Sequence, residues 1–132
     1  MTFTPSDGPL MKLTDGNWPL TLKEPMTYQS EIAYRLFGPS GLVVPAGFRS
    51  DLASVPRLFW RLFPPFGKYS LAAIAHDYCY ARLRDRMHRA DADALFLEAM
   101  EERGVPKRER YPMYWAVRYG NYFTAGGKGW AG

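Results

Sequence analysis

Four side chains in the second half of the sequence are of types that carry out acid–base chemistry. His76 and Asp77 are adjacent in the stretch AIAHDYCY, Tyr80 follows one helical turn later, and Asp93 lies in the stretch ADALF. A carboxylate beside a histidine fixes the tautomer and orientation of the imidazole, so its other ring nitrogen can take a proton from water or a hydroxyl. These residues therefore predict either an acid–base site or a polar network that only joins two helices.

The pattern of apolar residues predicts three helices that carry these side chains. We expect helices over residues 69–84, 89–103 and 112–123, the last of them opened by Pro112. The first is apolar almost all round, which is typical of a helix that is buried on most sides. The candidate groups are therefore expected inside the molecule rather than on an open surface.

Helical geometry then assigns each candidate group to a face. His76, Asp77 and Tyr80 share one side of the first helix, because residues three and four apart are neighbours on a helix. Asp93 falls inside the apolar arc of the second helix, whereas Asp91 falls on its polar arc. A carboxylate that faces a core is costly unless something pairs with it, and in a helical hairpin the position opposite Asp93 is close to His76. We therefore predict that His76 and Asp93 pair.

The N-terminal part differs from the helical second half, because turn-forming residues separate short runs with strand character. The first 50 residues hold six of the eleven prolines, and the runs LTLKE, AYRLF and GLVVPAGF favour strands. We expect an α+β fold with a small N-terminal antiparallel sheet or meander followed by a three-helix C-terminal half. The expected single domain, 1–132, comprises a β-rich part, a connector, a helical part and a flexible tail: 1–50, 51–69, 70–123 and 124–132.

The connector contains the stretch PRLFWRLFPPFGKY, which has more large apolar groups than one short helix can bury. We expect an exposed membrane or partner surface made by Arg57, Trp60, Arg61, Phe63 and Phe66. Aromatic rings interleaved with cations suit a lipid interface, and Trp and Arg also suit a protein interface. The alternative is that the segment folds back into the core.

Two further carboxylates are secondary candidates for the site. Asp91 lies two residues before Asp93, and Asp51 lies at the start of the connector, where a helix cap is the alternative to a functional role.

Composition limits the classes of protein to which the chain can belong. Its 132 residues are 47% hydrophobic and 16% aromatic, which is typical of a globular chain and not of a disordered one. The formal net charge of +4 permits contact with phosphate groups without requiring it. A single cysteine, Cys79, excludes an intramolecular disulfide framework. We expect neither a signal peptide nor a transmembrane segment.

The stretches AIAHDYCY and ADALF together resemble the active-site helices of the phospholipase A2 superfamily. The resemblance is greatest to the disulfide-free viral capsid version, with its pattern A-x-x-H-D-x-x-Y followed by A-D-x-x-F. It implies that His76 activates a water, that Asp93 orients it and that Tyr80 braces Asp93 by a hydrogen bond. It also implies a calcium ion held by Asp77. The chain departs from the superfamily in lacking paired cysteines and the usual glycine-rich calcium loop.

Three longer stretches, VPAGFRSDLASVPRLFW, PPFGKYSLAAIAHDYCY and RADADALFLEAMEERGV, resemble a family of small phage and prophage proteins of unknown function. This resemblance implies a protein made in the bacterial host cytoplasm that then joins the tail or particle of the virion. The expected partners are other virion or tail proteins, a lipid membrane surface or a second copy, and not nucleic acid. We expect lipid-ester hydrolysis during host entry or release, with a non-catalytic structural component of the tail or particle as the alternative.

Overall fold

The computed structural model describes residues 2–4, 13–15, 19–50 and 70–120. The chain divides into two compact units, Met1–Asp51 and Leu52–Gly132, and each is described by itself. The connector, the tail, Asp51 and the aromatic surface predicted within the connector lie outside the described residues. The expected single domain stays a prediction. No helix in the described part of the chain is long and apolar enough to cross a membrane.

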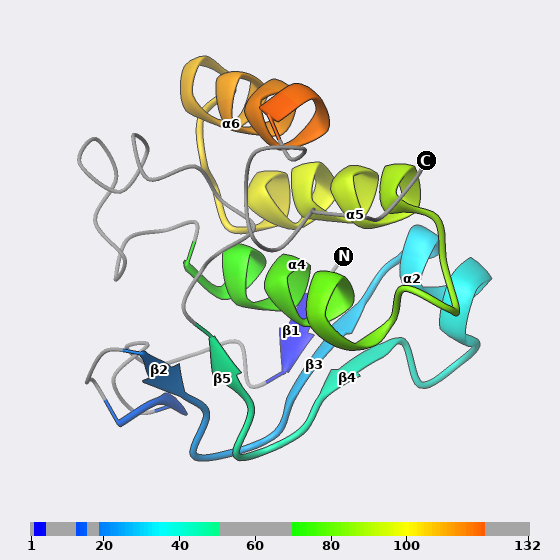
Figure 1. Ribbon diagram of the computed structural model, residues 1–132, viewed down its shortest axis with the longest axis vertical. Coiled ribbons are helices and arrows are strands. Elements are labelled where there is room, and N and C mark those ends of the chain that lie inside the picture. Colours follow the sequence, from blue (N-terminus) through cyan, green and yellow to red (C-terminus); the bar gives the residue numbers. More distant parts are fainter. Residues whose placement is uncertain (1, 5–12, 16–18, 51–69, 121–132) are drawn as a thin grey trace. The chain divides into compact units, whose positions relative to one another are not determined.

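In the first unit, short strands pair in an antiparallel manner (Figure 1). A three-stranded sheet has the order β1 (Thr2–Thr4), β3 (Met26–Gln29) and β4 (Leu42–Val44). A second sheet pairs β2 (Leu20–Thr21) with β5 (Arg49–Ser50). Side chains alternate along a strand, and the larger sheet accordingly buries one set of its residues, namely Phe3, Met26, Tyr28, Leu42 and Val44.

Residues 31–37 form a helix, so the strand predicted for AYRLF was wrong. The helix α2 (Glu31–Phe37) begins after Ser30, whose hydroxyl accepts a hydrogen bond from the backbone N–H of Ala33 at 3.0 Å. It ends at Gly38, which has a φ of 84° that glycine adopts without strain. A serine cap at one end and a glycine at the other stabilise a helix, and here they outweigh the strand preference of the aromatic residues.

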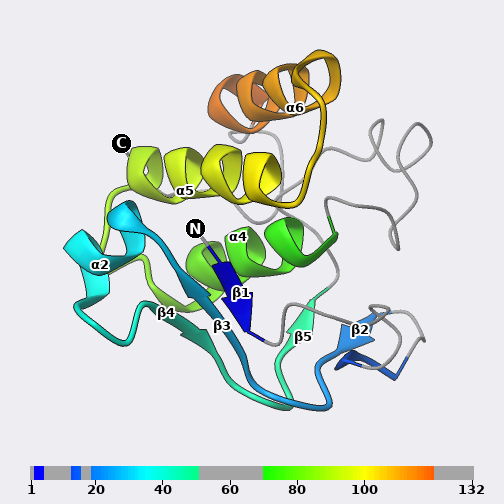
Figure 2. The same cartoon turned by 180° about the vertical axis from the view of Figure 1, so that it is seen from behind.

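The described part of the second unit contains three helices, α4 (Ser70–Arg82), α5 (Arg89–Glu102) and α6 (Lys107–Gly120). The helix α5 packs against both α4 and α6, as both views show (Figures 1 and 2). Small residues of α4, among them Ala72 and Ala73, are completely buried and let the neighbouring backbone approach. The predicted α+β class, with strands first and helices in the second half, is confirmed.

The last helix begins earlier than the sequence analysis predicted. We expected Pro112 to open it, but Pro112 lies inside α6. The carbonyl of Pro106 accepts hydrogen bonds from the backbone N–H groups of Glu109 and Arg110, both at 2.9 Å. Pro106 is therefore the proline at the start of α6. Pro112 lies within the same helix, where it lacks the backbone N–H that another residue would donate.

Candidate active site

His76 of α4 and Asp93 of α5 meet inside the second unit. The Nε2 atom of His76 lies 2.7 Å from Oδ1 of Asp93, and both side chains are 0% exposed. The short connection over residues 83–88 turns the chain back, so that α5 packs on α4 and brings the two groups together. The predicted His76–Asp93 pair therefore forms, while its role in catalysis stays a prediction.

Tyr80 binds the same carboxylate oxygen as His76. Its hydroxyl donates a hydrogen bond to Oδ1 of Asp93 at 2.5 Å. The ring centroids of His76 and Tyr80 are 4.3 Å apart, and Phe96 stacks on His76 with centroids 4.5 Å apart and an angle of 24° between the ring planes. The orientation of the imidazole is thus fixed by a carboxylate and by two aromatic rings.

The second oxygen of Asp93 contacts two arginines that the sequence analysis did not include in the site. Arg118 of α6 donates from Nη1 to Oδ2 of Asp93 at 3.0 Å, and Nη1 of Arg89 lies 3.8 Å from the same atom. Arg89 precedes Asp93 by one helical turn, so this contact was detectable from spacing. The contact of Arg118 with Asp93 forms only when α6 packs on α5, and no short-range spacing in the sequence predicts it.

Arg89 also fixes the end of α6. Its Nη1 atom donates to the backbone carbonyls of Val117 and Arg118, at 3.3 Å and 3.0 Å. The last carbonyls of a helix have no partner within the helix, and a cation there also interacts favourably with the helix dipole. The buried Arg89 therefore holds the end of α6, and with it Arg118, near Asp93.

These contacts set the protonation of the network. Burial raises the pKa of Asp93, but the hydrogen bond and charge of His76 and the hydrogen bonds of Tyr80 and Arg118 outweigh it and lower that pKa below its usual value. Burial and the charge of Asp93 raise the pKa of Tyr80, so its hydroxyl stays protonated. An ionised carboxylate only accepts hydrogen bonds. Nε2 of His76 therefore donates to Asp93, and in the neutral form of an imidazole that donates from Nε2 the lone pair is on Nδ1.

The other predicted carboxylates have different surroundings. Asp77 is buried, with 6% of its surface exposed. Asp91 accepts a hydrogen bond from the backbone N–H of the exposed His88 at 3.3 Å. It therefore stabilises the start of α5 and is not brought into the contacts of Asp93.

Asp77, the candidate calcium ligand, is among the described residues. Among these residues no three His, Cys, Asp or Glu side chains gather in a way that could hold a metal ion. Calcium takes six to eight oxygen ligands, so the described residues do not fit the ion by themselves. The calcium site stays a prediction, and no step below depends on it.

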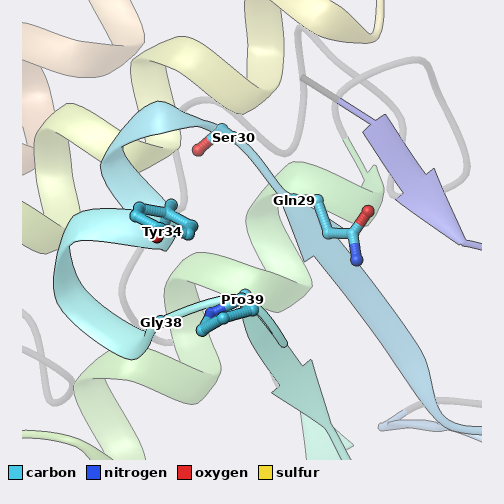
Figure 3. A pocket seen from close by; sticks show the side chains of 6 residues that line it. Gln29, Ser30, Tyr34, Gly38 and Pro39 are labelled. Carbon is cyan, nitrogen blue, oxygen red and sulfur yellow. The ribbon is translucent and has the colours of Figure 1, made fainter.

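Neither the buried Cys79 nor a surface hollow of the first unit provides a group for acid–base catalysis. Cys79 is buried, and burial together with the charge of Asp93 raises its pKa to about 12, so the thiol is not a nucleophile. In the first unit, a shallow hollow lies between the end of β3 and the two ends of α2 (Figure 3). Its lining includes no carboxylate, histidine or cysteine: Gln29, Ser30, Tyr34, Gly38, Pro39 and Gly41.

Comparison with known proteins places the chain in a family. Residues 20–117 match the family described as "Protein of unknown function (DUF1353)". The chain belongs to the DUF1353 family. The matched part of this DUF1353 protein includes His76, Tyr80, Arg89 and Asp93 and ends one residue before Arg118.

A curated relative of this DUF1353 protein is the "Uncharacterized protein y4jT" of Sinorhizobium fredii (strain NBRC 101917 / NGR234). The identity is 40% over an alignment of 91 residues, and the match covers 65% of this chain and 26% of the relative. The chain thus spans about a quarter of the length of that relative. No solved structure matches the chain significantly.

Proposed function

We propose that this DUF1353 protein hydrolyses esters with a phospholipase A2-like His76–Asp93 pair. The observation that carries the proposal is the double hydrogen bond to Oδ1 of Asp93, from Nε2 of His76 and from the hydroxyl of Tyr80. This geometry agrees with the roles that the sequence resemblance implies: His76 is the base, Asp93 orients it and Tyr80 braces Asp93. A histidine held in one tautomer beside a carboxylate is suited to general-base catalysis.

In the proposed reaction, Nδ1 of His76 takes a proton from a water molecule whose oxygen attacks the ester carbonyl carbon. The imidazolium is stabilised by the ionised carboxylate of Asp93. When the tetrahedral intermediate collapses, the C–O bond to the alcohol breaks and the imidazolium returns the proton to the leaving oxygen. One ester and one water thus give one carboxylic acid and one alcohol. Arg118 and Arg89 support the ionised form of Asp93 throughout.

The lipid substrate and the place of action belong to the same proposal. Both rest on the sequence resemblances: lipid esters on the likeness to phospholipase A2, and a phage tail or particle during host entry or release on the likeness to small phage proteins. The resemblance to phospholipase A2 also implies a calcium ion at Asp77, which the described residues by themselves do not fit. The reaction is therefore to be measured with calcium and with a chelator.

The test of this function is fatty-acid release from phospholipid vesicles by the purified chain. We expect the wild type to release fatty acid and His76→Gln to release none, with circular dichroism showing that the variant is folded. Asp91→Asn is the matched control, because Asp91 lies outside the contacts of Asp93 and should leave the rate unchanged. No release by the folded wild type, with and without calcium, would overturn the proposal.

The complete burial of His76 and Asp93 favours a second candidate function. A buried polar network that joins three helices also suits a non-catalytic structural component of a phage tail or particle. In that case His76→Gln lowers the melting temperature and there is no ester hydrolysis to lose. Recovery of the protein in purified particles, together with an inactive wild type, would support this second function.

A further inference from the structure

The helix α6 presents three exposed aromatic side chains on one side. Tyr111, Trp115 and Tyr119 are 41%, 50% and 73% exposed. They are spaced four residues apart, so they form one continuous stripe on the helix. Trp115 and Tyr119 stack on each other, with ring centroids 5.5 Å apart and an interplanar angle of 13°. A contiguous exposed patch of large apolar side chains usually marks an interaction surface.

The charges around this stripe select an anionic partner. Lys107 and Arg108 are exposed at the start of α6. Arg108 lies within about 20° of Trp115 around the helix, at 100° per residue. The single acidic residue of α6, Glu109, lies about 120° away from Trp115. The exposed stripe therefore combines aromatic rings with positive charge and includes no carboxylate of its own helix.

Two other cations of α6 belong to the interior of the second unit. Arg110 donates to the carbonyl of Val105 at 3.0 Å, and Arg118 donates to Asp93 at 3.0 Å. The inward side of the helix is thus used for packing, with Met113 and Val117 completely buried. Within the described residues of α6, the opposite side, with the aromatic stripe, is the side left for a partner.

We infer that the aromatic stripe of α6 binds the anionic surface of a lipid bilayer. Tyr and Trp have an apolar body and a polar tip, and such side chains are favoured at the depth of the lipid headgroups. Lys107 and Arg108 then meet the lipid phosphates. A convex helix fits a flat surface, and mutual stacking already covers one ring face of both Trp115 and Tyr119, which a nucleic-acid base would otherwise use.

A lipid-binding surface on α6 would bring the proposed hydrolase to its substrate. The inference rests on the proposed function only for the identity of that substrate. The helix that carries the stripe also supplies Arg118 to Asp93, so bilayer binding would bring the candidate site to a lipid ester. Binding itself requires neither His76 nor Asp93. The two proposals can therefore fail separately.

Co-sedimentation with vesicles tests the inference. One vesicle is pure phosphatidylcholine and the other contains equal parts of phosphatidylcholine and phosphatidylglycerol, both at low salt. We expect binding to the anionic vesicle, reduced about tenfold in Trp115→Ala/Tyr119→Ala. Lys107→Gln/Arg108→Gln should lose the preference for the anionic vesicle. Tyr34→Ala, which changes an exposed tyrosine of the first unit, is the matched control and should bind like the wild type.

The same experiment identifies the results that overturn the inference. It fails if the wild type sediments with neither vesicle, or if the Trp115→Ala/Tyr119→Ala protein sediments like the wild type. It also fails if that variant loses self-association or single-stranded DNA binding while vesicle binding stays unchanged. Loss of binding in Trp60→Ala/Phe63→Ala alone would assign the lipid surface to the connector instead. Binding by His76→Gln without ester release would leave this inference standing and remove the hydrolytic function.

Discussion

The carboxylate of Asp93 is held by side chains from three helices. Its Oδ1 atom faces His76 and Tyr80 of α4, and its Oδ2 atom faces Arg118 of α6 and Arg89 of its own helix. Each of these donors favours the ionised form of Asp93, whose side chain is 0% exposed. Single substitutions in this network should therefore affect stability and the state of His76 together.

Arg118 tests how much one donor to Asp93 contributes to the stability of the folded chain. Arg118→Gln should lower the free energy of unfolding by about 1–3 kcal/mol, because it removes a charge-assisted hydrogen bond to a buried carboxylate. Its side chain is 22% exposed, so the loss should be smaller than for a fully buried ion pair. Urea unfolding measures the change. Arg86→Gln, at an exposed arginine, is the control, and equal losses in both variants would contradict the role of Arg118.

The lowered pKa of Asp93 predicts how stability depends on pH. A carboxyl whose pKa is lower in the folded state contributes stability above its unfolded value of about 3.9 and loses it as the pH falls toward the folded value. We expect acid unfolding of the wild type to include this loss. Asp93→Asn should be less stable at neutral pH and should show a shallower fall in stability below about pH 4. A fall equally steep in wild type and variant would contradict the assignment.

At the scale of elements, the helices were predictable and their ends depended on caps. Apolar spacing predicted helices over 69–84 and 89–103, close to the observed α4 and α5. The error at residues 31–37 arose because the short run AYRLF has aromatic strand character, whereas the serine and glycine caps on either side decide its structure. For α6, either Pro106 or Pro112 could stand at the helix start. The observed start is at Pro106, because its carbonyl accepts the first hydrogen bonds of the helix.

The position of Pro112 inside α6 leads to a prediction about stability. Proline lacks the N–H that a helix interior uses, and its side chain here is exposed, so Pro112→Ala adds a donor without opening a cavity. We expect the free energy of unfolding to rise by up to about 3 kcal/mol, the cost of proline relative to alanine in a helix interior. Pro106→Ala, at the helix start where the missing N–H has no partner to lose, should give no such gain. Thermal unfolding measures the stability of both variants. An equal gain in Pro112→Ala and Pro106→Ala would contradict the assignment of Pro106 to the helix start.

At the scale of the whole molecule, the sequence predicted the pair but not its full set of contacts. The His76–Asp93 contact followed from one buried carboxylate and one buried histidine on neighbouring helices. Arg118 is distant in sequence from both, and its role required the packing of a third helix. The matching family is described as one of unknown function and the curated relative as an uncharacterized protein, so neither supplies a chemistry.

The calcium prediction concerns the stability of the whole chain. If Asp77 binds calcium, millimolar calcium should raise the melting temperature, because a ligand that binds only the folded state stabilises it. Asp77→Asn should remove this increment, and magnesium should not reproduce it at the same concentration. A wild-type melting temperature that is the same with calcium and with a chelator would leave Asp77 without a role as a metal ligand.

The central claim is that Asp93 orients His76 for the hydrolysis of an ester. The most direct measurement compares fatty-acid release from phospholipid vesicles by the wild type and by Asp93→Asn, each checked by circular dichroism. An amide at this position no longer requires Nε2 of His76 to donate, so the wrong tautomer is favoured, and we expect release to fall by about 10³-fold or more while the fold persists. Release by a folded Asp93→Asn protein at the wild-type rate would contradict the claim.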